Sequence, residues 1–268
     1  MTNASPPALG LRRWRAMVGD AAIAGLERPG VGAPVVLLHG WGARADTFTA
    51  LLVRLRTPRP VWAPDLPGFG ESPLGAGGWT TAAYAALVRR WVEEAGWDRV
   101  SLLGHSYGGG VAVRVAAGPG APVDRLCLCD AAGLRLSPAA DVRRSRLAYR
   151  RRRRLGRLVP PRWRGRLEAR WRERYGSTDY RAAGPLRPTL VDAVNEDLAP
   201  VARTVSVPTL LLWGAQDQDL PVATAAARYR ELIAGSELVV LERSGHFPFL
   251  DEPQRCAAIV DAFVDARL

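Results

Sequence analysis

The sequence predicts an α/β fold built around a mostly parallel sheet, and two observations support this prediction. Short apolar runs bounded by Gly, Pro and Asp alternate with longer segments of helical character, which is typical of βαβ units. The chain has 268 residues, of which 48% are hydrophobic, so it can bury a core without disulfides or a structural metal. By length it is one large domain or a core domain with an insertion.

The apolar runs are candidate strands, and the segments between them are candidate helices. Residues 14–18 and 21–26 flank Gly19 and Asp20 and predict an antiparallel hairpin at the start of the sheet. Buried strands are then expected, in chain order, at residues 35–38, 61–63, 100–103, 125–129, 209–213 and 237–241. Helices are expected after the glycine-rich run 104–110 and at residues 43–55, 81–95 and 253–266.

Residues 131–207 interrupt this alternation. They contain no strand-like run, favour helix, and are rich in arginine, with five consecutive arginines at 150–154. We expect a helical cap here, inserted into a core made of residues 1–130 and 208–268. Successive residues of an α-helix are 100° apart, so five arginines surround the helix and cannot share one outward face. Either this turn stands clear of the core, or some of its guanidinium groups point to a cleft or to acidic partners such as Glu168 and Glu173.

The net charge of +11 comes from 37 basic and 26 acidic residues. Such a charge is typical of nucleic-acid-binding proteins, but the chain has no recognised nucleic-acid module and concentrates its arginines in the insertion. We therefore expect no nucleic-acid partner. Two interpretations of the arginine-rich insertion stay open: a solvated surface, or a patch that attracts an acidic substrate.

Composition also indicates the compartment and the absence of metal. The N-terminus lacks the apolar run of a secretory signal, and no stretch of about 18 apolar residues occurs. We expect a cytoplasmic protein without stable membrane insertion, of unknown oligomeric state. Cys127, Cys129 and Cys256 lack the spacing and the nearby histidines of a metal site, so we expect small apolar fillers in a reducing compartment.

The run Gly104-His105-Ser106-Tyr107-Gly108 has the pattern Gly-x-Ser-x-Gly. A buried strand precedes it and a helix of small residues follows, so the serine lies on a tight strand-to-helix turn. Such a turn is strained and closely packed, which requires glycine on both sides. Ser106 is thereby held at the carboxyl edge of the sheet beside a helix N-terminus that favours negative charge, and it is our candidate nucleophile.

A serine nucleophile needs a base, and the chain has three histidines. His39 ends a strand, and His105 flanks the serine and is expected to point away from it. His246 lies in a glycine-flanked loop after the last predicted strand, so it is our candidate general base.

The base needs a carboxylate that orients it. Asp217 follows the predicted strand 209–213, which gives the chain order Ser106, Asp217, His246. Asp219, two residues on, and Asp130, at the end of strand 125–129, are the alternatives.

An oxyanion intermediate needs N–H donors, each worth about 3–4 kcal/mol in the rate. The amide of Tyr107 follows the nucleophile, and the loop 39–42 can supply the amide of Trp41. The alternative is that the glycines of this loop only permit a tight turn.

Five motifs together resemble the α/β-hydrolase fold family, in its capped small-molecule serine hydrolase branch. They are His39-Gly-Trp-Gly42, Asp65-Leu-Pro-Gly-Phe-Gly70, Gly104-His-Ser-Tyr-Gly-Gly109, Trp213-Gly-Ala-Gln-Asp217 and Gly245-His246. The resemblance implies an eight-stranded sheet, a helical lid after the sixth strand, and a Ser-His-Asp triad that needs no cofactor. It also implies that Asp65 belongs to a structural turn, and Ser106 excludes the branches with an aspartate nucleophile.

Within this family the chain resembles carboxylesterases that cleave the methyl ester of pimeloyl carrier protein, and carbon–carbon hydrolases of meta-cleavage pathways. The latter often have Trp after the histidine and Asn before the serine, where this chain has Phe247 and His105. We therefore expect a carboxylesterase that cleaves an ester or thioester of a small or carrier-bound acyl substrate. Carbon–carbon hydrolysis of a meta-cleavage diketone is the alternative, and nucleic-acid binding through the cap is a distant one.

Overall fold

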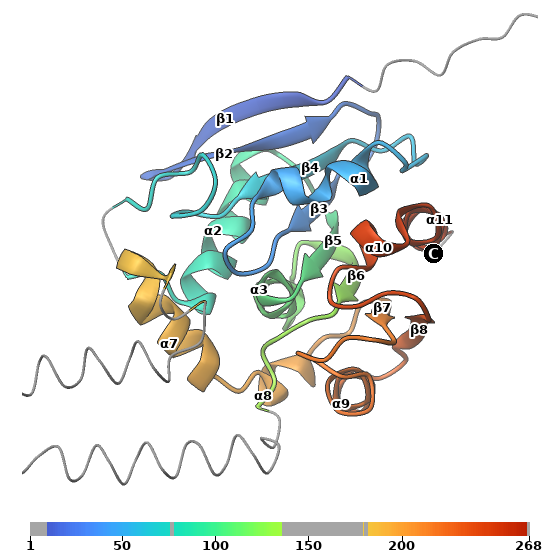
Figure 1. The fold of residues 1–268 in the computed structure, drawn as a ribbon. Helices are drawn as coiled ribbons and strands as arrows, with labels where there is room; N and C mark the ends of the chain where they lie inside the picture. The colour runs from blue at the N-terminus through green and yellow to red at the C-terminus, as the bar shows by residue number, and fades with distance from the viewer. Residues whose placement is uncertain (1–9, 76–77, 136–178, 180–181, 267–268) are drawn as a thin grey trace, which may run out of the picture.

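The structure is a computed structural model that describes residues 10–75, 78–135, 179 and 182–266. Its strands are β1 (Arg12–Val18), β2 (Ala21–Arg28), β3 (Val35–Leu38), β4 (Val61–Asp65), β5 (Val100–His105), β6 (Val123–Cys129), β7 (Thr209–Gly214) and β8 (Glu237–Leu241). Within the described residues they form one eight-stranded sheet in the order β1-β2-β4-β3-β5-β6-β7-β8 (Figure 1). The pairs β1-β2 and β2-β4 are antiparallel and all others are parallel, which confirms the predicted hairpin and the mostly parallel sheet.

Helices cover both faces of this sheet (Figure 1). They are α1 (Thr49–Leu52), α2 (Thr81–Glu94), α3 (Tyr107–Ala116), α7 (Arg187–Asn195), α8 (Ala199–Ala202), α9 (Ala225–Leu232), α10 (Pro248–Asp251) and α11 (Pro253–Val264), with 3₁₀ turns η1 (Ala45–Phe48) and η2 (Gly184–Leu186). One core packs α2, α3 and α9 against the sheet, and the other packs α1, α10 and α11. Val36 and Leu38 of β3 belong to the first core, and Val35 and Leu37 to the second. The central strands are therefore buried on both faces, as continuous apolar runs predict.

One predicted helix has a different form in the structure. The helix expected at 43–55 is wrong in its form: a 3₁₀ turn over Ala45–Phe48 leads into one α-helical turn over Thr49–Leu52. The buried N–H of Ala45 donates to the Asp65 side chain, which fixes the start of this segment by a tertiary contact rather than by helix propensity.

The insertion is described only in part. Its described residues between β6 and β7 form η2, α7 and α8, and the chain returns next to α3 through a bridge between Ala117 and Val205. Arg150 to Arg154, Glu168 and Glu173 lie outside the described residues. The division into core and cap stays a prediction.

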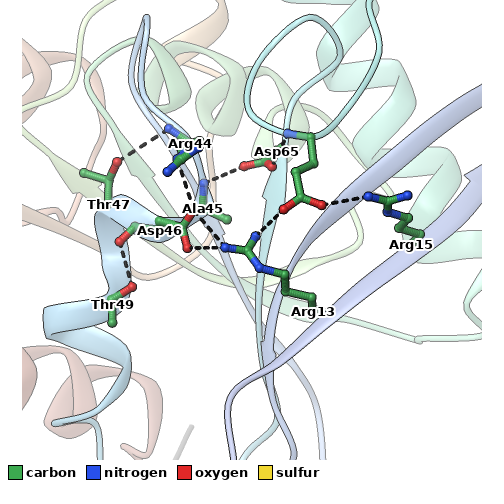
Figure 2. A network of polar contacts seen from close by, with 9 residues as sticks. Arg13, Arg15, Arg44, Ala45, Asp46, Thr47, Thr49 and Asp65 are labelled. Carbon is green, nitrogen blue, oxygen red and sulfur yellow. Dashed lines mark hydrogen bonds and ion pairs between the residues drawn. The ribbon is translucent and has the colours of Figure 1, made fainter.

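Asp65, at the end of β4, joins two loops of the carboxyl edge to the sheet (Figure 2). Its buried Oδ1 accepts from the N–H of Ala45 over 2.6 Å, and its Oδ2 accepts from the N–H of Glu71 over 2.8 Å. Toward the surface, Arg13 of β1 pairs with Asp46 at 3.0 Å and with Glu71 at 2.7 Å. One buried carboxylate and one exposed ion-pair network therefore hold the same two loops.

We expect the buried contact to contribute far more stability than the exposed one. Asp65→Ala leaves two N–H groups without acceptors and should lower the free energy of unfolding by about 2–4 kcal/mol, measured by urea denaturation. Arg13→Ala, the control, removes ion pairs of a side chain that is 52% exposed and should have a clearly smaller effect. Equal effects of the two substitutions would contradict this assignment.

Candidate active site

Ser106 lies on the turn between β5 and α3, where the backbone is strained. Its φ is 51° and its ψ is −117°, values that a side-chain-bearing residue rarely adopts. A Cβ on Gly104 would lie 2.4 Å from the Gly108 carbonyl oxygen, and a Cβ on Gly108 would lie 2.3 Å from the Leu38 carbonyl oxygen. Both glycines are therefore required by close approach of the backbone, as the sequence pattern predicted.

The structure brings Ser106, His246 and Asp217 together in one chain of hydrogen bonds. His246 Nδ1 lies 2.8 Å from Asp217 Oδ2, and His246 Nε2 lies 3.0 Å from Ser106 Oγ. Because a carboxylate only accepts, Nδ1 carries the proton and Nε2 accepts from the serine hydroxyl. This is the arrangement in which an imidazole can remove the proton of a serine.

Asp217 is completely buried and well supplied with donors. Its Oδ1 accepts from the N–H groups of Asp219 and Leu220 at 2.8 and 3.0 Å. Burial alone would raise the pKa of Asp217, but the hydrogen bonds from His246 and Leu220, with the neighbouring Asp130, outweigh it and hold the pKa below its usual range. Asp217 is therefore ionised at neutral pH.

The alternative acids have different places. Asp219 is exposed and reaches Asp217 through its backbone N–H. Asp130 is buried, and one of its oxygens lies within 4.8 Å of a carboxylate oxygen of Asp217 and of a ring nitrogen of His246.

The loops that carry Asp217 and His246 are fixed to each other by their backbones. The N–H of Gln216 donates to the Ser244 carbonyl oxygen over 2.9 Å. A Cβ on Gly214 would lie 2.0 Å from the Gly245 carbonyl oxygen. The distance between the acid and the histidine is thus set by main-chain packing rather than by flexible side chains.

The loop after β3 brings Gly40, the residue before Trp41, next to the serine. A Cβ on Gly40 would lie 3.1 Å from Ser106 Cβ. The buried His39 donates from Nδ1 to the Gly40 carbonyl oxygen over 2.8 Å and accepts at Nε2 from the N–H of Leu66 over 3.0 Å. The Gly40 carbonyl and the Trp41 N–H share one peptide plane, so His39 also fixes the direction of that N–H.

Tyr107 is the first residue of α3, so its N–H has no partner within the helix. Its ring packs edge-on against the ring of Trp41, with centroids 5.5 Å apart. The two amides expected to bind an oxyanion therefore come from segments in direct contact.

A cavity of about 370 Å³ lies beside the Trp41 loop. Most of its lining is apolar and includes Trp41, Phe69, Leu74 and Leu186. It has room for an apolar chain next to Trp41.

His105 has a structural contact that sequence analysis did not anticipate. Its buried Nε2–H donates to the backbone carbonyl oxygen of His246 over 2.7 Å, and its ring lies against those of His246 and Phe249. Burial is the largest cause that lowers the pKa of His105, to about 3. A neutral His105 therefore holds the loop of His246 in place through this hydrogen bond.

Among the described residues, one group of three side chains brings potential metal-ligating atoms close together. It consists of Asp130, Asp217 and His246. Both His246 nitrogens are engaged by Asp217 and Ser106, and Asp130 Oδ1 accepts from the N–H of Gly214. We assign these atoms to hydrogen bonding rather than to metal ligation.

Neutral burial of His105 predicts an acid-dependent loss of stability. The folded pKa is about 3 and the unfolded one about 6.5, so below pH 6.5 the unfolded chain binds the extra proton and stability falls toward pH 3. We expect His105→Gln to reduce the slope of unfolding free energy against pH, between pH 4 and 6, by up to one proton, or about 1.4 kcal/mol per pH unit. Urea denaturation at several pH values measures it. The slopes of the two proteins should coincide above pH 7.5, and coincidence at all pH values would contradict the neutral assignment.

No described helix has both the length and the apolar character needed to span a bilayer.

Comparison with known proteins assigns the fold to a family. Residues 35–259 match the model of the alpha/beta hydrolase family. An uncharacterized protein of Mycobacterium tuberculosis is 30% identical over 273 residues, covering 88% of this chain and 76% of the relative. A pimeloyl-[acyl-carrier protein] methyl ester esterase of Neisseria meningitidis is 31% identical over 245 residues, covering 86% of this chain and 93% of the relative.

Among solved structures, a membrane phospholipase A described as a bacterial virulence factor superimposes with a TM-score of 0.75 and 27% identity. The match covers 96% of this chain and 86% of the other. The match to the family model spans most of the chain and includes Ser106, Asp217 and His246. The chain therefore belongs to the alpha/beta hydrolase family.

Proposed function

We propose that this chain is a serine hydrolase that cleaves an ester or thioester of a small or carrier-bound acyl substrate. The observation that carries the proposal is the continuous hydrogen-bond chain from Ser106 Oγ through His246 to the buried Asp217. A hydroxyl with an oriented base is a nucleophile for acyl transfer. The donors beside it, the amides of Trp41 and Tyr107, suit the oxygen of a carbonyl under attack.

The proposed reaction has two halves. Ser106 Oγ attacks the acyl carbon while His246 Nε2 takes its proton, and the amides of Trp41 and Tyr107 bind the resulting oxyanion. His246 then gives the proton to the leaving oxygen or sulfur, and an acyl-Ser106 ester remains. Water, deprotonated by the same imidazole, hydrolyses this ester and restores the serine. Asp217 holds the tautomer of His246 throughout and stabilises the imidazolium.

Two observations support the proposed substrate class. The largely apolar cavity beside Trp41 fits an acyl chain, and the name of the Neisseria meningitidis relative specifies an ester on an acyl carrier. We propose carboxylesterase activity of this kind, with residues 131–207 as the cap over the site.

The first test is hydrolysis of p-nitrophenyl acetate, butyrate and octanoate. Ser106→Ala should lose the activity by roughly 10⁴-fold or more, because no nucleophile remains. Asp217→Asn should lose on the order of 10⁴-fold in kcat, because His246 adopts the wrong tautomer. Asp219→Asn is the matched control two residues away, and it should keep the wild-type rate.

The outcomes separate the candidate activities. If the wild-type protein hydrolyses none of the esters, simple esterase function is wrong, and a meta-cleavage-type diketone becomes the substrate to test. If Ser106→Ala keeps the wild-type rate, another nucleophile performs the reaction.

The arginines at 150–154 suggest an acidic acyl substrate or carrier. For an ester that carries a free carboxylate, we expect kcat/KM to fall with rising ionic strength and on replacement of these five arginines by glutamine, because a single-sign patch accelerates association. Steady-state kinetics with a neutral ester of equal length provides the control. If the acidic ester shows no more dependence on salt and on the arginines than the neutral one, the acidic-substrate proposal is wrong.

A further inference from the structure

The carboxyl group of Asp130 lies beside Asp217 and His246, at the end of β6. One oxygen of Asp130, one of Asp217 and one ring nitrogen of His246 all lie within 4.8 Å of one another. Asp130 is 0% exposed, and the side chain of Asp217 is also fully buried. Two carboxylates this close and away from water do not both ionise, so one of them keeps its proton.

The hydrogen bonds decide which carboxyl group keeps the proton. Asp217 accepts from three N–H groups, those of His246 Nδ1, Asp219 and Leu220. Asp130 accepts at Oδ1 from one N–H, that of Gly214, over 3.0 Å, and at Oδ2 only from the weaker S–H donor of Cys129 over 3.6 Å. Donors stabilise the ionised form, so the negative charge belongs on Asp217 and the proton on Asp130.

The other titratable groups near Asp130 do not supply a positive charge to ionise it. Burial is the largest cause that raises the pKa of Asp130, to about 8; the neighbouring Asp217 adds to it, whereas the Gly214 N–H and the Cys129 thiol lower it in part. The Cys129 thiol lies 3.6 Å from Asp130 Oδ2. Burial raises the pKa of all three nearby thiols, so they are neutral at pH 7: Cys127 and Cys129 on β6 and Cys256 on α11.

The backbone around Asp130 is strained and is hydrogen-bonded to β7 and to Ser106. Asp130, with a φ of 43°, and Ser106 are the two non-glycine residues with positive φ among those that the structure describes. The N–H of Asp130 donates to the Leu212 carbonyl oxygen over 3.1 Å, and the N–H of Ala132 donates to the Ser106 carbonyl oxygen over 2.9 Å. Strained residues of this kind persist where the surroundings fix them, often at functional sites.

We propose that Asp130 is a further positioning residue: a neutral carboxylic acid that donates its O–H to Asp217 and so keeps Asp217 as the ionised partner of His246. The inference rests on the proposed serine hydrolase function and adds a fourth side chain to its hydrogen-bond chain. Deprotonation of Asp130 removes the donor and adds a second negative charge beside Asp217.

The first test needs no substrate. The infrared difference spectrum between the wild-type protein and Asp130→Asn at pH 6 should contain the band of a protonated carboxyl group, which fades as the pH passes through about 8. Asn keeps an N–H donor for Asp217 and an oxygen for Gly214, so the fold is expected to persist. The difference spectrum with Asp219→Asn, the control, should lack this band. Carboxylate bands for Asp130 at pH 6 overturn the proposal, whatever the esterase result.

The second test is the pH profile of ester hydrolysis. Wild-type kcat/KM should fall as the pH rises through about 8, in step with the infrared band, and Asp219→Asn should show the same fall. Asp130→Asn should stay flat through this range. A uniform loss in Asp130→Asn, with the shape of the profile unchanged, would mean a merely structural role.

Removal of the O–H donor of Asp130 should lower kcat rather than weaken substrate binding. Asp130→Ala should lower kcat by roughly 10- to 100-fold with KM nearly unchanged, because a misplaced Asp217 misaligns His246. A rise in KM with kcat unchanged contradicts the proposal.

Discussion

Close backbone packing at the carboxyl edge of the sheet is the constraint on which the candidate site depends. Gly108 lies against the carbonyl of Leu38, and Gly214 lies against the carbonyl of Gly245. The first approach joins the turn of Ser106 to the end of β3, and the second joins the loop of Asp217 to the loop of His246, before any side chain is considered. Because the loops contact each other through main-chain atoms, a Cβ at either glycine would push the serine, the acid and the histidine apart. The hydrogen bonds of Ser106, His246 and Asp217 are therefore a consequence of packing.

Around this frame, the two histidines outside the proposed triad are kept neutral. Burial lowers the pKa of His39 and of His105, and both rings are fixed by hydrogen bonds to backbone groups. In a region of low dielectric, a stray charge near His246 would alter its proton affinity strongly. When these histidines are neutral, the negative charge of Asp217 is the strongest electrostatic influence on the imidazole of His246.

Much of the architecture was predictable from the sequence, because its apolar runs are short, separate and bounded by Gly, Pro or Asp. The hairpin at Gly19-Asp20 and the parallel strands were found this way. The segment 43–55 was not, since a tertiary hydrogen bond from Ala45 to Asp65 decides where it begins. Side chains at strand ends could be assigned to one edge, and the structure does bring Ser106, Asp217 and His246 together there.

Sequence patterns could not predict the contacts that Asp130 and His105 make beside the candidate triad. Asp130 looked like a competitor of Asp217 because both follow parallel strands, and only the three-dimensional arrangement shows that β6 and β7 are neighbours whose acids can share a proton. His105 gave no signal for its bond to the His246 carbonyl, since spacing along the chain does not report which way a ring turns.

The segment between β6 and β7 leaves and re-enters the core at almost one point. The N–H of Leu198 donates to the Gly133 carbonyl oxygen over 2.8 Å, so the two ends of this segment are tied together. The entropy of closing such a loop grows only with the logarithm of its length. A change in the length of this segment is therefore expected to cost the sheet little stability.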